Sequence, residues 1–105
     1  MAIVSRYLTI TQGNLDNRHM YLTECMDLFP ADAIGGPDGE QAAPRTVRVE
    51  YGSEAVDTDI VRDKHIFRRR GWVRGFFAAT GLTAGDQVLL EQIEPYRYRV
   101  SKAGR

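Results

Sequence analysis

One segment near the middle of the chain has the pattern of an amphipathic α-helix, and it constrains the fold more than any other feature. An apolar stripe at helical spacing is formed by Trp72, Val73, Phe76 and Phe77. Gly81 follows where a helix would end, because glycine readily adopts the left-handed conformation of a C-terminal cap. We expect Trp72, Phe76 and Phe77 to be structural core, with the helix plugging a small β-structure.

Most of the remaining chain has strand character. β-branched and aromatic composition or alternating polarity predicts strands at 3–11, 18–23, 45–51, 55–61, 65–69, 87–94 and 96–102. Asn and Gly predict a turn at 12–17, and 62–64 reads as a polar tip. The pattern indicates a mainly β fold: a seven-stranded open β-barrel, or pseudobarrel, with one or two short helices capping its ends.

Residues 24–44 interrupt the strands. They begin as a possible short helix, which Phe29-Pro30 would end, because a residue before proline is disfavoured in the helical conformation. The Gly- and Pro-rich remainder predicts a mobile loop over residues 30–44. A length of 105 residues is that of one domain, so we expect a single domain over residues 1–105.

Several classes of protein are disfavoured by composition. No apolar run approaches the roughly 20 residues of a membrane span, and the N-terminus has no signal-peptide pattern. We therefore expect a cytoplasmic protein without a membrane partner. The one cysteine, Cys25, excludes an internal disulfide framework and is interpreted as a small buried apolar residue. We expect no metal or other cofactor.

The net charge of zero hides an asymmetry between the two parts of the chain. Residues 1–44 carry a net charge of −4, and residues 45–105 carry +4. Residues 62–74 alone hold six Arg or Lys side chains and one Asp. Because a polyanion responds to the local field, this segment is compatible with nucleic-acid binding, although a solvated charged surface would look the same. On a strand, successive side chains point to opposite faces. At least one of Arg68, Arg69 and Arg70 would therefore point outward near this tip.

No complete catalytic set is present. Asp57 and Asp59 could share one face of a strand and hold a hard cation. The nuclease pattern of Pro-Asp followed by an acidic residue, one residue and lysine fails, because Asp63 directly precedes Lys64. The chain lacks a nucleophile elbow and a phosphate loop. His19 and His65 could act as acid or base, but beside arginines they are more typical of phosphate or surface contacts. We expect no enzyme activity from this chain by itself.

Two stretches carry a family resemblance. "HIFRRRGWVRGFFAATGLTAGDQVLL" (65–90) resembles the C-terminal half of the B3 pseudobarrel DNA-binding domain: a basic residue before Gly-Trp, a short helix with central Phe, a Leu-x-x-Gly-Asp turn and an apolar strand. "GNLDNRHMYL" (13–22) resembles the first loop of that domain. Plant transcription factors carry B3 domains, and restriction enzymes of the EcoRII and BfiI kind carry related recognition domains. "LFPADAIGG" (28–36) looks more like the prokaryotic branch.

The resemblance implies sequence-specific binding of double-stranded DNA through two loop arms in the major groove. The arms would be residues 12–19 and residues 62–65. The chemistry of their side chains agrees with this, since amides pair with adenine edges, Arg with guanine, and basic groups with phosphates. The expected contacts are Gln12, Asn14, Asn17, Arg18, His19, Arg62, Lys64, His65, Arg68 and Arg70. Asn14 and Asn17 could equally serve to form the turn.

Two functions of different class remain open from the sequence. The chain could be a DNA-binding domain, standing alone or serving as the recognition part of a restriction endonuclease whose nuclease domain or subunit lies elsewhere. Alternatively, it could be a small β-barrel that binds a protein or a small molecule. The swapped-hairpin regulators share the Leu-x-x-Gly-Asp turn, but they are much shorter and lack the helix that begins at Gly-Trp.

Overall fold

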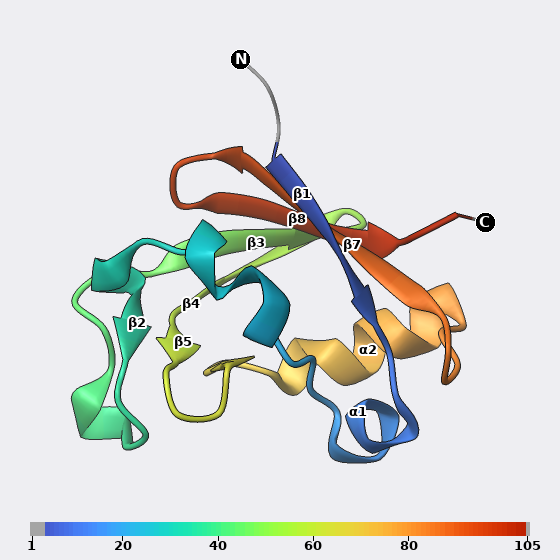
Figure 1. The fold of residues 1–105 in the computed structure, drawn as a ribbon, viewed down its shortest axis with the longest axis horizontal. Coiled ribbons are helices and arrows are strands. Elements are labelled where there is room, and N and C mark those ends of the chain that lie inside the picture. The colour runs from blue at the N-terminus through green and yellow to red at the C-terminus, as the bar shows by residue number, and fades with distance from the viewer. Residues whose placement is uncertain (1–3, 105) are drawn as a thin grey trace.

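A five-stranded sheet, a three-stranded sheet and one helix of ten residues make up most of the fold (Figure 1). The computed structural model describes residues 4–104. In chain order the elements are β1 (Val4–Thr9), α1 (Gln12–Asn17), the 3-10 helices η1 (Thr23–Leu28) and η2 (Ala31–Ala33), β2 (Ile34–Gly35), the 3-10 helix η3 (Gly39–Gln41), β3 (Val47–Tyr51), β4 (Glu54–Thr58), β5 (Ile60–Val61), β6 (Ile66–Phe67), α2 (Gly71–Thr80), β7 (Gln87–Glu94) and β8 (Arg97–Lys102).

The larger sheet has the order β1-β7-β8-β3-β4, and the smaller has the order β2-β5-β6. Neighbouring strands are antiparallel except for β3 with β8 and β2 with β5. The predicted mainly β, open-barrel class is confirmed, with eight described strands in place of seven and neither sheet closed into a barrel. Ile3, the expected start of the first strand, lies outside the described residues.

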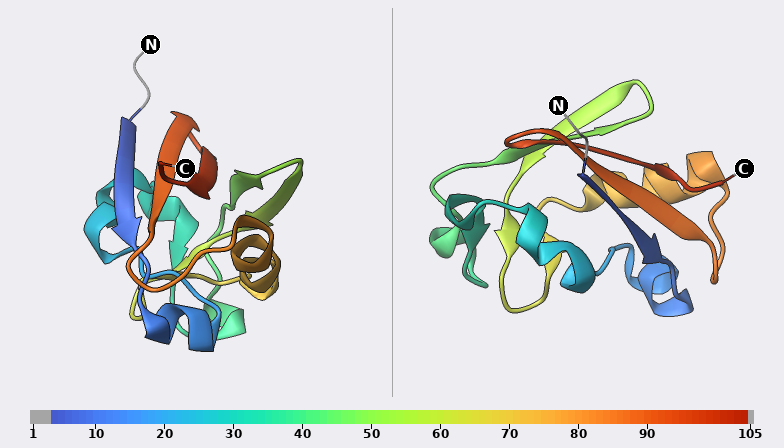
Figure 2. Two further views of the ribbon diagram at one scale, coloured as in Figure 1. Left: turned by 90° about the vertical axis from the view of Figure 1, so that its right-hand side faces the viewer. Right: turned by 45° about the horizontal axis from the view of Figure 1, so that its top comes forward.

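The helix α2 is where the apolar stripe predicted it. It ends at Gly81, which has φ 67° and donates its backbone N–H to the Phe77 carbonyl. Figure 2 shows α2 lying beside the β3–β4 hairpin, and the Tyr51 ring on β3 stacks on the Trp72 indole at 4.7 Å. Phe76 and Phe77 are buried as expected.

Trp72 differs from the expectation of a buried core residue, because its side chain is only partly buried at the edge of the core. Its indole Nε1 donates to the Arg69 carbonyl at 2.7 Å. A tryptophan at the start of a helix can keep its polar edge near the surface while its ring packs inward. The core therefore centres on the strands, with Val47, Val49, Leu90 and Tyr98 fully buried.

Two predicted elements near the N-terminus take other forms. Residues 12–17 form α1 rather than a turn. Residues 18–23 do not form a strand, although the alternation is real: Met20 and Leu22 are buried and Tyr21 between them is exposed. Among residues 4–104, no strand pairs with this segment. A backbone bond from Leu22 N–H to the carbonyl of His65, at 2.6 Å, ties the segment to the residue that precedes β6.

The segment predicted as a loop over residues 30–44 contains η2, β2 and η3. Ala33 is fully buried, and the Tyr96 hydroxyl donates to the Asp32 carboxylate at 2.9 Å. At its other end, Ala43 N–H donates to the Asp59 carboxylate at 2.8 Å. The segment is thus anchored to the sheets at several points. Within residues 4–104, no helix is both long and apolar enough to cross a membrane.

Candidate nucleic-acid interface

The first expected arm is a short helix held by a reciprocal cap. Thr11 Oγ1 accepts from the Asn14 N–H at 3.1 Å, and Asn14 Oδ1 accepts from the Thr11 N–H at 2.9 Å. Asn14 is 2% exposed, so its amide oxygen caps α1 and the side chain does not project from the outer surface of the arm. Gln12, Asn17 and Arg18 remain exposed on the surface. Of the three expected amide contacts, two are therefore available at the surface.

The second expected arm is the turn between β5 and β6, which leaves three successive polar residues exposed: Arg62, Asp63 and Lys64. His65 closes the turn with φ 54°, and its N–H donates to the Val61 carbonyl at 2.8 Å. The Arg62 N–H donates to the Gly35 carbonyl at 3.0 Å, which fixes the turn against β2. A turn anchored at both sides holds its exposed side chains in one place.

One side-chain contact ties each arm to a residue that lies outside both arms. His65 Nδ1 lies 3.0 Å from Thr23 Oγ1, and Arg70 Nη1 lies 3.1 Å from His19 Nδ1. The second contact spans 51 residues of sequence. In Figure 1 and Figure 2, α1 and the β5–β6 turn lie at the same end of the molecule. Of these four residues, His19 and His65 belong to the predicted arms, and Thr23 and Arg70 hold them from outside.

His19 is kept neutral by its surroundings. Partial burial lowers the pKa of its imidazole below the usual value, and the positive charges of Arg70 and Lys64 lower it further. Because a guanidinium only donates hydrogen bonds, Nδ1 of His19 accepts from Arg70. His19 therefore aims the Arg70 guanidinium and adds no positive charge of its own near neutral pH.

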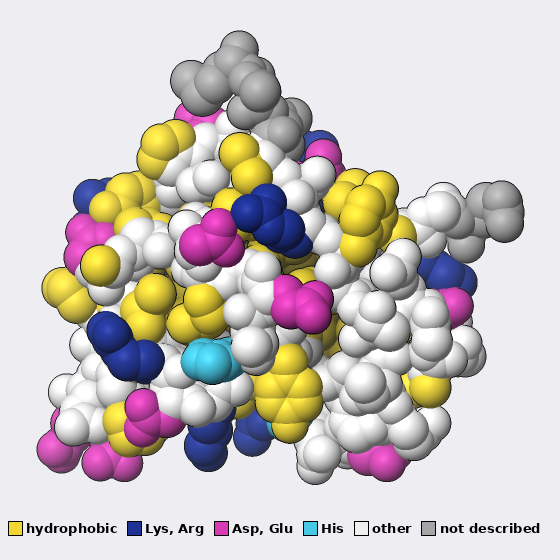
Figure 3. All heavy atoms as spheres, viewed as in Figure 1, with side chains coloured by type: hydrophobic (Ala, Val, Ile, Leu, Met, Phe, Trp, Pro, Cys, Tyr) yellow, Lys and Arg dark blue, Asp and Glu magenta, His cyan; other side chains and the backbone are white. Residues whose placement is uncertain are grey.

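Several cations at this end of the molecule form no ion pair within residues 4–104. Among residues 4–104, the Lys and Arg side chains without an ion pair are Arg18, Arg45, Arg62, Lys64, Arg69, Arg70 and Arg74. Arg45 stacks on the Tyr96 ring at 3.7 Å. We name Arg18, Arg62, Lys64 and Arg70 the basic face: the first three belong to the two arms, and Arg70 contacts His19 of the first arm. In Figure 3, Lys and Arg side chains gather at the lower edge, with acidic groups to either side.

Arg68 has a different role from the phosphate contact expected of it. Its Nε donates to both carboxylate oxygens of Asp59, at 2.7 and 3.0 Å, and Asp59 is 4% exposed. Its other nitrogens donate to the carbonyls of Gly36, at 2.6 Å, and Asp38, at 3.1 Å. Arg68 is thus a clamp between the sheet and the loop around η3. The same ion pair occupies Asp59, which the sequence had offered as half of a cation site with Asp57.

Tyr21 is a surface residue that the sequence analysis overlooked. It is 50% exposed, and its ring lies 4.7 Å from the His19 ring in an edge-on arrangement. The alternation of residues 18–23 was the available signal, because it puts Tyr21 on the side opposite Met20 and Leu22. An exposed aromatic ring therefore adjoins the basic face.

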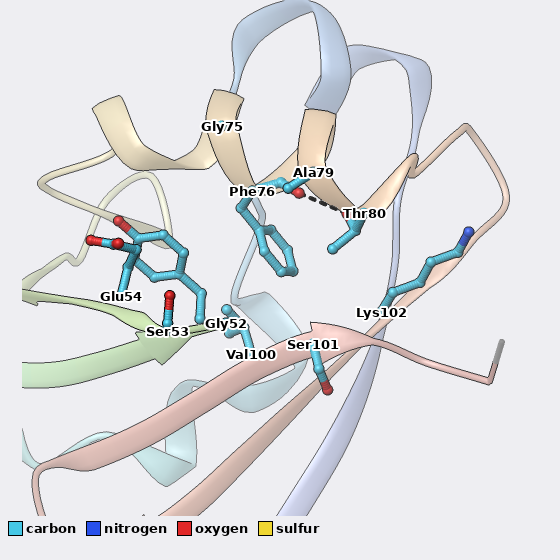
Figure 4. Close-up of a pocket in the computed structure, with 11 residues that line it drawn as sticks. Gly52, Ser53, Glu54, Gly75, Phe76, Ala79, Thr80, Val100, Ser101 and Lys102 are labelled. Atoms are coloured by element: carbon cyan, nitrogen blue, oxygen red, sulfur yellow. Dashed lines mark hydrogen bonds between the residues drawn. The ribbon is translucent and has the colours of Figure 1, made fainter.

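A separate hollow lies far from the arms, between the tip of the β3–β4 hairpin, α2 and β8 (Figure 4). Its volume is about 530 Å³, and Phe76 and Val100 form part of an apolar lining. The hollow exists because β3 and β8 pair only from Arg48 to Glu50, after which they diverge. Glu54 and Lys102 stand toward opposite ends of it in Figure 4.

Comparisons with known proteins give one structural likeness and no family assignment. No protein-family model matches the chain, and no curated protein matches it. Among solved structures, the chain is similar to the "N-terminal domain of Helicobacter pylori LlaJI.R1", with a TM-score of 0.57 and 14% sequence identity. The alignment covers 97% of this chain and 87% of that one. At this identity the likeness concerns the fold, which the two chains share over nearly their whole length.

Proposed function

We propose that this protein is a B3-like domain that binds double-stranded DNA sequence-specifically through α1 and the β5–β6 turn. The observation that carries the proposal is the basic face, whose four cations have no ion pair within residues 4–104. Lys64 and Arg70 suit phosphate oxygens, whereas Arg18 and Arg62 suit guanine edges. Gln12 and Asn17 supply exposed amides beside them for adenine edges.

The structural neighbour supports this direction, because LlaJI.R1 is a restriction-system protein. By analogy of fold, the chain would serve as a recognition domain, and cleavage would belong to a nuclease domain or subunit outside it. We propose that the chain alone does not cut DNA. Supercoiled plasmid incubated with the protein and magnesium should stay intact, and metal-dependent nicking lost on changing Asp57 would overturn this.

The DNA proposal is tested by selecting bound duplexes from a random pool and then measuring fluorescence anisotropy on a selected and a scrambled duplex. Lys64→Ala should weaken binding to both duplexes and reduce the salt slope by about one phosphate contact. Asn17→Ala and Arg62→Ala should each cost about 1–3 kcal/mol on the selected duplex only. Arg48→Ala is the matched control, because Arg48 is an exposed arginine on β3 away from the arms.

Two results would defeat the proposal. If the parent binds neither duplex below about 0.1 mM, the weak end of typical non-specific affinity, the protein is not a DNA-binding domain. If the arm variants bind like the Arg48→Ala control, binding takes place elsewhere on the surface. The hollow beside Phe76 then favours the second candidate function, binding of an apolar small molecule or partner, because its volume of about 530 Å³ lies in the usual range for ligand pockets.

A further inference from the structure

A smaller pocket lies next to the basic face, between the end of β1, α1 and the residues that follow it. Its volume is about 270 Å³, and its lining includes Thr11, Asn14, Tyr21 and Glu24. Sites for drug-sized ligands usually measure about 300–1,000 Å³, so this pocket suits a single planar ring system.

Two wall residues of the pocket contact histidines that lie beside the basic face. Tyr21 contacts His19, which accepts a hydrogen bond from Arg70. Thr23 Oγ1, on another wall, lies 3.0 Å from His65 in the β5–β6 turn. A nucleotide whose phosphate lies at the basic face would therefore have its base within reach of the pocket.

The polar groups of the pocket complement the edge of an amino-bearing base. The Glu24 carboxylate is exposed and has no hydrogen bond or ion pair to any described side chain, so it is free to accept. Asn14 also lines the pocket, and its Nδ2 is a buried donor without an acceptor within residues 4–104. A buried donor left unpaired is costly. Cytosine and adenine each offer an exocyclic amine beside a ring acceptor, which matches one acceptor and one donor.

Tyr21 supplies the stacking surface that such a base would need. Its ring is half exposed although large aromatic side chains usually gain by burial, and the neighbouring Met20 and Leu22 are buried. An aromatic ring on a surface that carries unpaired cations is the usual platform for an unstacked base.

From these contacts we propose that the pocket receives one cytosine or adenine turned out of the duplex, stacked on Tyr21 and read by Glu24 and Asn14. The inference rests on the DNA-binding function proposed above. Turning a base out costs least where it is mismatched. A mismatch opposite the extruded base should therefore tighten binding, and loss of that base should weaken it.

The experiment scans the selected duplex with single opposite-strand mismatches and single abasic sites, with anisotropy as the readout. We expect one C or A position at which a mismatch raises affinity about tenfold and an abasic site lowers it. Tyr21→Ala should abolish both effects, while Tyr21→Phe should keep them because the ring remains. Tyr7→Ala is the matched control, since Tyr7 is a similarly exposed tyrosine, at 57%, on β1. Glu24→Gln should relax the preference for C or A at that position.

The outcomes separate this inference from the function on which it rests. If the parent prefers the selected duplex but no position gains from a mismatch, the base stays in the helix and the pocket proposal is wrong, while DNA binding stands. The same holds if Tyr21→Ala keeps the gain with a native circular dichroism spectrum. If the parent binds neither duplex, both proposals fail together.

Discussion

Removal of the Arg68 guanidinium should destabilise the fold, although Arg68 belongs to the most basic stretch of the chain. In Arg68→Ala the Asp59 carboxylate, 4% exposed, loses both bonds from Nε, and within residues 4–104 only the Ala43 N–H still donates to it. Breaking a buried pair by removing one partner typically costs about 3–5 kcal/mol, because the remaining charge is left uncompensated. The carbonyls of Gly36 and Asp38 also lose their donor.

The assay is urea unfolding followed by circular dichroism, with thermal melting as a second measurement. A loss of about 3 kcal/mol corresponds to a fall in Tm of roughly 12 °C or more for a domain of this size. Arg62→Ala is the control, since Arg62 is exposed and surface substitutions usually change stability by less than about 0.5 kcal/mol. The double variant Asp59→Asn/Arg68→Met should lose less than the sum of its single variants, because neither charge is then left alone.

If Arg68→Ala unfolded at the same urea concentration as Arg62→Ala, Arg68 would not stabilise the fold as a clamp. A variant that kept full stability but lost DNA affinity would instead restore the phosphate contact that the sequence suggested for Arg68. If Arg68 is a clamp, Arg68→Ala lowers the free energy of unfolding. If Arg68 is a phosphate contact, the same variant keeps its stability and loses DNA affinity.

Three further predictions concern single side chains. Phe76→Ala should cost about 3–5 kcal/mol, and Trp72→Ala less, about 2–3 kcal/mol, because the indole is only partly buried; urea unfolding measures both. Burial raises the pKa of the Cys25 thiol to about 12, so it should react with Ellman's reagent at pH 8 only after denaturation. Burial and neighbouring cations lower the pKa of His19, so the unfolded chain binds more protons below about pH 6.5. Stability should therefore fall as pH drops through that value, and His19→Gln should reduce this dependence in urea titrations at pH 5 to 8.

The elements that could be predicted from sequence are those whose signals are local. The predicted strand 87–94 coincides with β7. The end of α2 at Gly81 follows from the ability of glycine to adopt the left-handed conformation of a helix cap, which depends on that residue alone. By contrast, α1 contains Gly13, Asn14 and Asn17, which favour turns over helices in isolation. Its capping box uses Asn at the third helical position, where the familiar pattern has Glu or Gln, so the signal was easy to miss.

The candidate site was only partly accessible to sequence reasoning because it depends on long-range pairing. The alternation of residues 18–23 reported correctly which side chains are buried, but not that the segment lacks a strand partner. The positive run 68–70 likewise gave no sign that Arg68 turns to Asp59 while Arg70 turns to His19. The direction of each arginine side chain depends on a partner that lies nine residues away for Arg68 and fifty-one residues away for Arg70.

Arg68 binds its loop through the main-chain carbonyls of Gly36 and Asp38. The side chains at the tip of the loop can therefore be changed without loss of these bonds. Gly35 is sterically fixed, because a Cβ there would lie 2.6 Å from both Ala43 N and Gln41 O. Pro37 and Glu40, in contrast, are exposed and take no part in the clamp. New residues at these two positions could therefore alter the chemistry at the rim of the domain while its shape is preserved. The fold thus offers a graft site beside the arms, suited to diversification by library design.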